Sequence, residues 1–249
     1  MRMRKKKNGE KRMLACADIH IKQPETYKGR WRSLAGEKSL YAEIGCGKGG
    51  FITELAKRNP DSFYIGIEKV PDVIVVAMEK IKNAGLTNVL FVCGDAETLP
   101  AIFEEGELNG LYLNFSDPWP KKKHAKRRLT YVSFLERYKY ALKDGGKIFF
   151  KTDNRPLFDF SLEQFKLARI ALSDVTNDLH NSEYEADNIH TEYEDNFSAK
   201  GFTINRLVGT VDKSLPPVTA EEIEAYEKAQ KEAAKHEEAS DSEDNSEAE

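Results

Sequence analysis

Strand and helix patterns alternate over residues 39–171, and this alternation limits the possible folds more than any other feature of the chain. Short apolar runs indicate strands at residues 39–44, 63–67, 89–93, 111–115 and 147–152. Amphipathic spacing indicates helices at residues 51–58, 71–84, 130–142 and 156–171. A repeated strand, helix, strand order predicts an α/β fold with a mostly parallel sheet, helices on both faces, and ligand sites at the carboxyl ends of the strands.

A glycine-rich loop follows the first predicted strand and starts a candidate ligand site. It runs from Glu43 to Gly50 and contains the spacing Gly-x-Gly-x-x-Gly, which is a weak signal when it stands alone. The backbone at Gly45 and Gly47 can turn tightly and approach a ligand closely. The Glu43 carboxylate would repel a pyrophosphate, whereas it would attract a ligand that carries an ammonium and a sulfonium group. The loop therefore favours S-adenosylmethionine as the cofactor.

Two more acidic residues end the next two predicted strands. Glu68 follows the glycines by about twenty residues, the spacing at which a carboxylate accepts hydrogen bonds from ribose hydroxyls. Asp95 ends the third strand, where it can meet the amino edge of an adenine. Either residue alone could be an ordinary polar strand end, but together with the loop they form a set that fits a nucleoside.

A basic strip, residues 121–128, reads Lys-Lys-Lys-His-Ala-Lys-Arg-Arg and leaves the end of a predicted strand through a short loop. Basic runs alone are common on solvated surfaces and bind any nucleic acid loosely. The position of this strip at a strand end predicts that it brings a polyanion to the site. The alternative is a structural role, in which Arg127 and Arg128 pack at the start of the helix that begins near Thr130.

The loop before the strip reads Asp117-Pro-Trp-Pro120, and its prolines hold the acid and the indole in place. Methyltransferases of the adenine amino group use Asp-Pro-Pro-Tyr or Asp-Pro-Pro-Trp, in which the aromatic residue comes fourth. Here it comes third, so the match is imperfect. Trp119 could also simply cover the edge of the sheet.

Charge divides the chain into three parts. The whole chain has a formal net charge of −4, but the acid is concentrated in the last 35 residues, so the remainder is net basic. We expect a basic N-terminal arm at residues 1–30, a methyltransferase domain at residues 31–212 and an acidic tail at residues 213–249. The tail is expected to be disordered, with a lone charged helix over residues 220–236 as the alternative.

Several classes of protein are disfavoured. The three cysteines are widely spaced, and the five histidines show no ligand spacing, which argues against disulfides and a metal site. Because no apolar run approaches the length of a membrane span and the basic N-terminus lacks an apolar segment of signal-peptide type, we expect a cytoplasmic protein without a membrane partner.

These motifs together resemble those of the bacterial tRNA (guanine-N7)-methyltransferases. The resemblance extends to about Val211 and is most specific from Asp117 to Arg128. It implies a class I methyltransferase (Rossmann-like) fold of seven strands with the last antiparallel, and methylation of N7 of a guanosine in the tRNA variable loop. Two departures are the arm, which lacks a tryptophan often found after its basic start, and the acidic tail.

The resemblance, together with the glycine loop and the basic strip, implies roles for individual residues. The expected cofactor contacts are Glu43, Gly45, Gly47, Glu68, Asp95 and Asp117. The expected tRNA contacts are Lys121, Lys123, Lys126, Arg127, Arg128, Asp153, Thr191, Glu192, Tyr193 and Glu194. Asp117 and Asp153 are the candidate catalytic residues. Local stability gives a competing account of Thr191 and Glu194, which have the spacing of a helix capping box, and of Asp153, which could cap a helix.

Guanine N7 has a free lone pair, so its methylation requires alignment and no general base. Asp117, Asp153 and Glu194 could accept hydrogen bonds from the guanine edge and favour the charge that develops on it. Three alternatives remain open: methylation of an adenine amino group, an NAD-dependent oxidoreductase, and a noncatalytic RNA-binding protein. The protein could be a monomer or a homodimer.

Overall fold

The computed structural model describes residues 8–244, which divide into two compact units. The first ends at Leu215 and contains the sheet, and the second begins at Pro216 and contains one long helix, α9 (Ala220–Asp244). Reciprocal hydrogen bonds between Thr219 and Glu222 cap the start of α9. The structure thus contains the charged helix that the sequence left as an alternative, and disorder of the tail stays a prediction.

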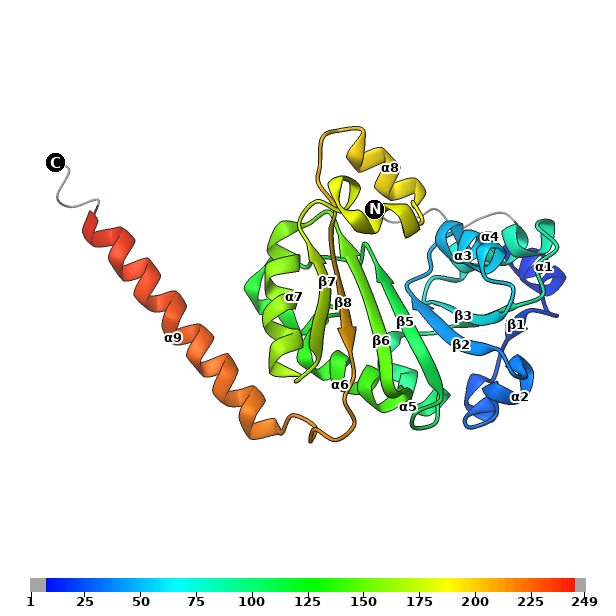
Figure 1. The fold of residues 1–249 in the computed structure, drawn as a ribbon, viewed down its shortest axis with the longest axis horizontal. Coiled ribbons are helices and arrows are strands. Elements are labelled where there is room, and N and C mark those ends of the chain that lie inside the picture. Colours follow the sequence, from blue (N-terminus) through cyan, green and yellow to red (C-terminus); the bar gives the residue numbers. More distant parts are fainter. Residues whose placement is uncertain (1–7, 245–249) are drawn as a thin grey trace. The chain divides into compact units, whose positions relative to one another are not determined.

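An eight-stranded sheet forms the centre of the first unit (Figure 1). The strands, in chain order, are β1 (His20–Ile21), β2 (Ser39–Ile44), β3 (Ser62–Glu68), β4 (Val89–Cys93), β5 (Leu108–Asn114), β6 (Leu142–Thr152), β7 (Ala171–Thr176) and β8 (Asn205–Thr210). Their order across the sheet is β1-β4-β3-β2-β5-β6-β8-β7. The strands from β1 to β6 pair in parallel, and β8 is antiparallel to both neighbours. The predicted α/β class is confirmed.

The expected count of seven strands is corrected by β1. This two-residue strand pairs in parallel with Phe91 and Val92 of β4, so part of the expected basic arm extends the sheet. The edge of a sheet offers unpaired backbone groups to any segment that passes along it.

Strand β7 was missed because the sequence pattern predicted a helix through residue 171. Helix α7 ends at Leu167, and Arg169 takes a left-handed conformation with φ of 57°. The amides of Arg169 and Ile170 donate to the carbonyls of Lys166 and Phe165, which completes a Schellman turn. Such turns usually place glycine in the left-handed position, so an arginine there gave no stop signal.

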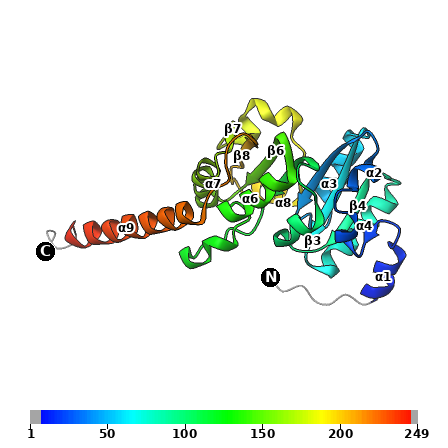
Figure 2. The same ribbon diagram turned by 90° about the horizontal axis from the view of Figure 1, so that it is seen from below.

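Helices cover both faces of the sheet (Figure 2). Five consecutive residues of β3, Phe63 to Ile67, are buried, which requires cover on both sides. The α-helices of this unit are α1 (Gly9–Ala15), α2 (Trp31–Ala35), α3 (Gly50–Arg58), α4 (Pro71–Asn83), α5 (Leu99–Ile102), α6 (Val132–Ala141), α7 (Arg155–Leu167) and α8 (Glu192–Ser198). Helices α3 and α4 pack against β3, whereas α6 and α7 pack against β6. Within residues 8–244 no helix is both long and apolar enough to cross a membrane.

The segment between β7 and β8, residues 177–204, forms a lobe that we call the α8 lobe. It contains α8 and two short 3-10 helices, η4 (Leu179–Asn181) and η5 (Glu183–Asp187). A hydrogen bond from the Leu179 amide to the Ile204 carbonyl, at 2.8 Å, closes its base. The lobe lies over the carboxyl end of β6 (Figure 1).

Candidate active site

A cleft of about 510 Å³ opens at the carboxyl ends of β2 and β5. The strands that follow β2 are added on one side of it as β3 and β4, and then on its other side as β5 and β6. The order therefore reverses between β2 and β5, which form the topological switch point at which open α/β sheets bind ligands. The side chains around the cleft include Glu68, Asp95, Asp117, Trp119, Lys126 and Arg127. Acidic and basic groups therefore share one cavity.

Glu43 lies buried beside this cleft, with 3% of its surface exposed. Asn114 lines the cleft, and its side-chain amide donates to Glu43 Oε1 at 3.0 Å. Burial raises the pKa of the Glu43 carboxyl to about 7, against the opposing effects of the Asn114 hydrogen bond and the Lys151 charge. Among the described residues Oε2 has no hydrogen-bond partner. A buried carboxylate oxygen without a partner suits a cationic ligand.

Glu68 connects the glycine loop to the end of β3. Its Oε2 accepts the amide of Gly47 at 3.2 Å, and its Oε1 accepts the amide of Val70 at 2.9 Å. These bonds fix the orientation of the carboxylate while each oxygen keeps a second lone pair. The side chain is therefore positioned to accept ribose hydroxyls in the cleft.

Asp95 is held in a similar way at the end of β4. Its Oδ1 accepts the Glu97 amide at 3.1 Å, which caps the short 3-10 helix η2 (Ala96–Thr98). Asp95, Ala96 and Glu97 all line the cleft. This acid thus has both the structural role of a cap and a position in the wall of the cleft.

Two glycines give the loop its shape for physical reasons. Gly45 has φ of 73°, and an added Cβ there would meet nothing within 4 Å, so the open space beside it belongs to the cleft. At Gly49, also with φ of 73°, an added Cβ would lie 2.6 Å from the Cβ of Ala77. Gly49 therefore lets α3 approach α4 closely, and Gly45 lets a ligand approach the backbone.

The loop after β5 holds an unusual backbone conformation at the wall of the cleft. Phe115 has φ of 52° and Trp119 has φ of 42°, values that cost about 1–2 kcal/mol in residues with a side chain. Arg128 stabilises this loop by donating to the carbonyls of Pro118 at 3.0 Å and Trp119 at 3.1 Å. Backbone strain of this kind concentrates at functional sites.

The basic strip contains residues that pack on the protein and residues that face solvent. Residues 122–127 form a 3-10 helix, η3 (Lys122–Arg127), which is separate from α6. The Arg127 guanidinium lies 4.9 Å from the centre of the Trp119 ring, and that of Arg128 lies 4.3 Å from the Phe160 ring. Lys121, Lys122 and Lys123 are exposed. The arginines thus brace the loop, and the three lysines present charge to solvent.

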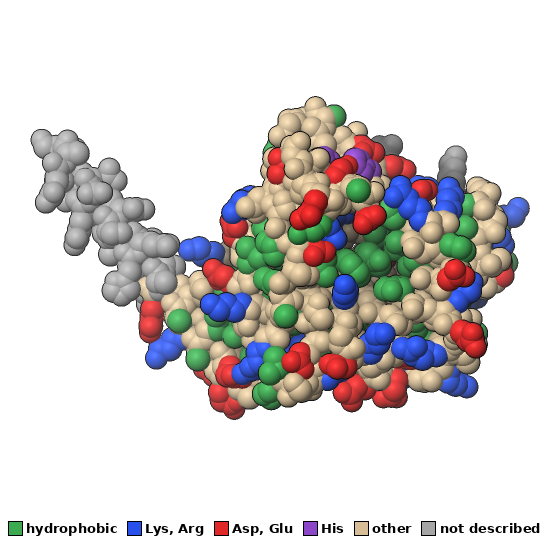
Figure 3. All heavy atoms as spheres, viewed as in Figure 1, with side chains coloured by type: hydrophobic (Ala, Val, Ile, Leu, Met, Phe, Trp, Pro, Cys, Tyr) green, Lys and Arg blue, Asp and Glu red, His purple; other side chains and the backbone are tan. Residues whose placement is uncertain are grey.

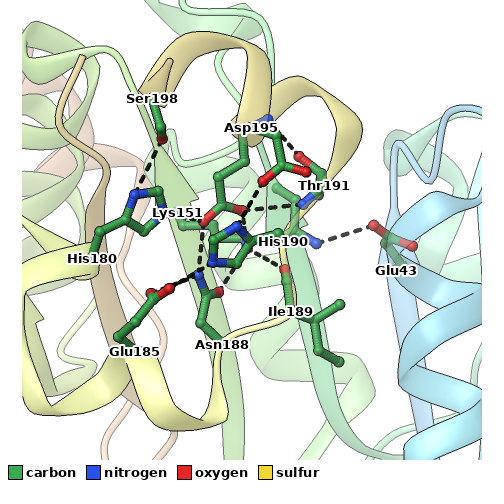
Figure 4. A network of polar contacts seen from close by, with 12 residues as sticks. Glu43, Lys151, His180, Glu185, Asn188, Ile189, His190, Thr191, Asp195 and Ser198 are labelled. Atoms are coloured by element: carbon green, nitrogen blue, oxygen red, sulfur yellow. Dashed lines mark hydrogen bonds and ion pairs between the residues drawn. The ribbon is translucent and has the colours of Figure 1, made fainter. Parts of the chain in front are cut away.

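Lys151, near the end of β6, holds the α8 lobe against the sheet. Its Nζ donates to Asn188 Oδ1 at 3.0 Å, to the Ile189 carbonyl at 2.7 Å and to Glu194 Oε2 at 2.5 Å (Figure 4). Burial lowers the pKa of Lys151, and the Glu194 charge opposes that effect. One buried cation therefore joins three points of the lobe to the strand.

Glu194 is the buried partner in this network. The carboxylate is 0% exposed, and it also accepts the Asn188 amide at 2.8 Å and lies 3.0 Å from His180 Nε2. Burial raises the pKa of Glu194, but the Lys151 charge and the hydrogen bonds from Lys151, Asn188 and His180 together outweigh that effect, so the pKa is lowered overall. The predicted capping box of Thr191 and Glu194 is confirmed. This geometry favours an anchoring role for Glu194 over the contact with guanine that we expected.

His180 and His190 stack in the same lobe, with ring centres 4.8 Å apart and planes 8° apart. Together with Glu194 they bring three possible metal ligands within 4.8 Å of one another. The lone pairs of an imidazole lie in the plane of its ring, so two nearly parallel rings do not aim at one ion. His190 instead contacts Asp195 at 2.7 Å and Glu185 at 2.6 Å (Figure 4). On the face drawn in Figure 3, histidine and acidic side chains gather at this lobe, above a hollow with hydrophobic side chains.

The structure brings together most of the expected cofactor residues. The residues that line the cleft are Gly45, Glu68, Asp95 and Asp117. Glu43 accepts a hydrogen bond from Asn114, which lines the cleft, and the Gly47 amide donates to Glu68. Among the expected tRNA contacts, Lys126 and Arg127 line the same cleft. Outside the cleft lining are Lys121, Lys123, Arg128, Asp153, Thr191, Glu192, Tyr193 and Glu194.

Sequence reasoning missed Lys151, Asn114 and Phe115 as site residues. A lysine near the end of a buried parallel strand is a recognisable signal, because such a charge must find a buried partner. The partner, Glu194, is 43 residues further along the chain, and no local pattern connects the two.

Comparisons with known proteins identify the family of this chain. A family described as a putative methyltransferase matches residues 37–207. The chain is 48% identical over 215 residues to the tRNA (guanine-N(7)-)-methyltransferase of Listeria monocytogenes serotype 4b (strain F2365), covering 86% of this chain and 100% of that one. It is 50% identical over 207 residues to the protein of that name from Bacillus subtilis (strain 168), covering 83% and 97%.

Solved structures show the same fold at low sequence identity. The 16S rRNA methyltransferase KamB has a TM-score of 0.55 at 16% identity, covering 74% of this chain and 93% of that one. An antibiotic-related methyltransferase has a TM-score of 0.54 at 19% identity, with the same coverage.

The sheet order and the acid-lined cleft at its switch point define a class I methyltransferase. The identity to the named relatives over nearly their whole length goes further: the chain belongs to the tRNA (guanine-N7)-methyltransferase family. The resemblance inferred from the motifs is confirmed. Family membership decides against the oxidoreductase, the noncatalytic RNA-binding protein and the adenine methyltransferase.

Proposed function

We propose that this protein transfers a methyl group from S-adenosylmethionine to N7 of a guanosine in the variable loop of tRNA. The observation that carries the proposal is the composition of one cleft, which joins Glu68 and Asp95 on the cofactor side to Lys126 and Arg127 of the basic strip. The relatives are named tRNA (guanine-N(7)-)-methyltransferases, which supports tRNA as the substrate and N7 of guanine as the methylated atom.

Residues of the cleft fit a cofactor with a nucleoside and a cationic amino acid part. Glu68 is held by two backbone amides and can accept ribose hydroxyls, and Asp95, which lines the same cleft, would accept a hydrogen bond from the adenine amino group. The unpartnered Oε2 of Glu43 supplies negative charge beside Gly45, where the backbone is open. When bound, S-adenosylmethionine supplies an electrophilic methyl group.

Positioning is the main task of the protein in this reaction, because guanine N7 attacks through a lone pair and loses no proton. Holding the two reactants in line can supply about 7–11 kcal/mol of the barrier. Asp117 lines the cleft and is exposed, and Asp153 is half-buried at the end of β6. Their carboxylates would accept hydrogen bonds from the guanine N1 and N2 groups and stabilise the positive charge that develops on the ring.

Nucleoside mass spectrometry of unmodified tRNA after incubation with protein and S-adenosylmethionine tests the proposal. We expect 7-methylguanosine in the digest and a large loss of product with Asp117→Asn. Asp61→Asn is the matched control, since Asp61 is exposed in the turn before β3, away from the cleft. A methyl group found only on an exocyclic amine would overturn the assignment of N7.

A further inference from the structure

Four aromatic rings form a continuous row that starts at the cleft and runs along α8. Phe115 lines the cleft, and its ring centre is 5.1 Å from that of Tyr193. Tyr193 stacks on Phe197 at 4.2 Å with planes 19° apart, and Phe197 contacts Phe202 at 5.5 Å. The row therefore connects the site of methyl transfer to a surface that the proposed chemistry does not use.

Two rings of this row are open to solvent. Tyr193 is 43% exposed and Phe202 is 51% exposed. The other large hydrophobic residues that are exposed in the described part of the chain are all aliphatic: Leu14, Leu34, Val70, Val175 and Leu215. Exposed aromatic rings thus occur at one place, next to the cleft. An exposed apolar group that is gathered beside a polar site indicates a binding surface more than an incidental one.

Polar groups give the row the character of a nucleotide site. Lys200 Nζ lies 4.9 Å from the centre of the Phe197 ring, which places a cation beside the outer rings. The Tyr193 hydroxyl donates to Asp153 Oδ2 at 3.3 Å, which orients the ring at the end nearer the cleft. Flat rings beside a cation match the two parts of an unpaired nucleotide, since the base stacks and the phosphate pairs with the charge.

Extruding a base from a folded RNA also explains why a second stacking surface is useful. A flipped target leaves its chain neighbours without part of their own stacking, which raises the free energy of the complex. A ring outside the cleft can replace that lost stacking.

We propose that Phe202, supported by Phe197 and Lys200, stacks on an unpaired base next to the target guanosine. The inference rests on the proposed function, because it takes a single guanosine of a tRNA as the target in the cleft. It adds a second base subsite about three rings away from the cleft wall, as the row from Phe115 to Phe202 defines it.

Steady-state kinetics with tRNA at saturating S-adenosylmethionine tests the subsite. We expect Phe202→Ala to lower kcat/KM for tRNA about tenfold, mainly through KM, since stacking contributes about 1–3 kcal/mol per base. Phe202→Leu keeps the apolar contact with Phe197 but removes the flat ring, so it should lose nearly as much. Phe202→Tyr should keep activity within about twofold, because its ring stacks equally well. Leu34→Ala, which removes a comparably exposed side chain from α2, is the matched control and should change nothing.

Abasic tRNAs identify the partner of Phe202. We expect one of the two abasic tRNAs, which lack the base on one side or the other of the target guanosine, to be methylated more slowly by the wild-type enzyme. With that abasic tRNA, Phe202→Ala should be as fast as the wild-type enzyme, because the base that Phe202 contacts is already missing. An unchanged KM for Phe202→Ala, or a full effect of the mutation with both abasic tRNAs, would overturn the subsite. So would full activity of Phe202→Leu, which would show a plain apolar contact. Failure of the wild-type protein to form 7-methylguanosine would instead sink the proposed function.

Discussion

The two sides of the cleft are built in different ways. On the cofactor side, Glu68 and Asp95 end adjacent strands, and backbone amides within two residues or on the glycine loop hold their carboxylates. On the substrate side, the α8 lobe depends on Lys151, and the loop after β5 depends on Arg128. Local backbone geometry fixes the first side, whereas a few long side chains fix the second. The comparison teaches that the substrate side should be the easier one to disrupt.

Replacing Lys151 should have the largest effect. Lys151→Met leaves the Glu194 carboxylate buried without its charge partner, and breaking a buried pair costs about 3–5 kcal/mol. We expect that loss in the free energy of unfolding measured with urea, together with loss of tRNA methylation. Cofactor binding should be weakened less, through the higher pKa of Glu43 once the opposing Lys151 charge is gone, because the carboxylates of Glu68 and Asp95 do not depend on the lobe.

A double variant separates the charge from the packing. Lys151→Met combined with Glu194→Leu removes both charges, so it should recover much of the stability that the single variant loses. If the single variant is as stable as wild type, the lobe does not depend on this pair, and the contrast between the two sides fails.

Glu43 tests the cofactor side. Glu43→Gln keeps the shape of the side chain and its contact with Asn114 but removes the charge, so the dissociation constant for S-adenosylmethionine should rise at least tenfold, or about 1.4 kcal/mol. The protein itself should not be destabilised at pH 8, because a neutral amide is easier to bury than a carboxylate. Calorimetry that shows unchanged cofactor affinity would contradict the role of Glu43.

The pH dependence of cofactor binding follows from the same residue. The pKa of the Glu43 carboxyl is about 7 in the folded protein, raised by burial from 4.5. Because the folded state holds this proton more tightly, its contribution to stability is present below about pH 4.5 and is lost as the pH rises through 7. Cofactor affinity should move in the opposite direction and rise by up to about tenfold per pH unit below pH 7, since the carboxylate attracts the cation. Titration calorimetry from pH 5.5 to 7.5 measures it, and Glu43→Gln should flatten the curve.

The cofactor side could be predicted from the sequence better than the substrate side, because its contacts are local along the chain. The strands β2 and β4 were predicted to the residue, and Glu43, Glu68 and Asp95 were predicted to lie at one edge of the sheet because each is within two residues of a strand end whose place in a parallel sheet is fixed by the repeat. On this side the information is local, so spacing along the chain is enough.

On the substrate side the decisive contacts join distant residues. Lys151 and Glu194 are 43 positions apart, and the pattern of α8 showed only its capping box. The left-handed Arg169 concealed the end of α7 and therefore β7. The resemblance to a family pointed to Asp153 and to residues 191–194 as substrate contacts, which stays a prediction, and the burial of Glu194 could be learned only from the packed structure.

The basic strip can be divided into its two roles. Lys121, Lys122 and Lys123 are exposed, so replacing all three by alanine should weaken tRNA binding and lower the slope of log affinity against log salt by up to about 2–3, at unchanged thermal stability. Arg128→Ala removes the two bonds to the loop carbonyls, so it should lower the melting temperature and the rate of methylation. Binding measured over a salt series, beside melting curves, compares the two variants. An unchanged slope in the triple variant would show that these lysines do not meet phosphate.

Removing the acidic tail should have the smallest effect. A cut after Leu215 follows the boundary between the two units and keeps Lys213, whose amide donates to Asp144 at 2.9 Å. The melting temperature should therefore stay unchanged. If the tail competes with RNA for the basic surface, tRNA affinity should rise a few-fold at low salt, and the difference should vanish near 1 M salt, where the Debye length is about 3 Å. A full-length variant with Glu221, Glu222, Glu224 and Glu227 changed to glutamine should give part of the same gain, because charge and not length is the cause. Equal affinities of the full-length and shortened proteins at low salt would show that the tail does not act on the tRNA surface.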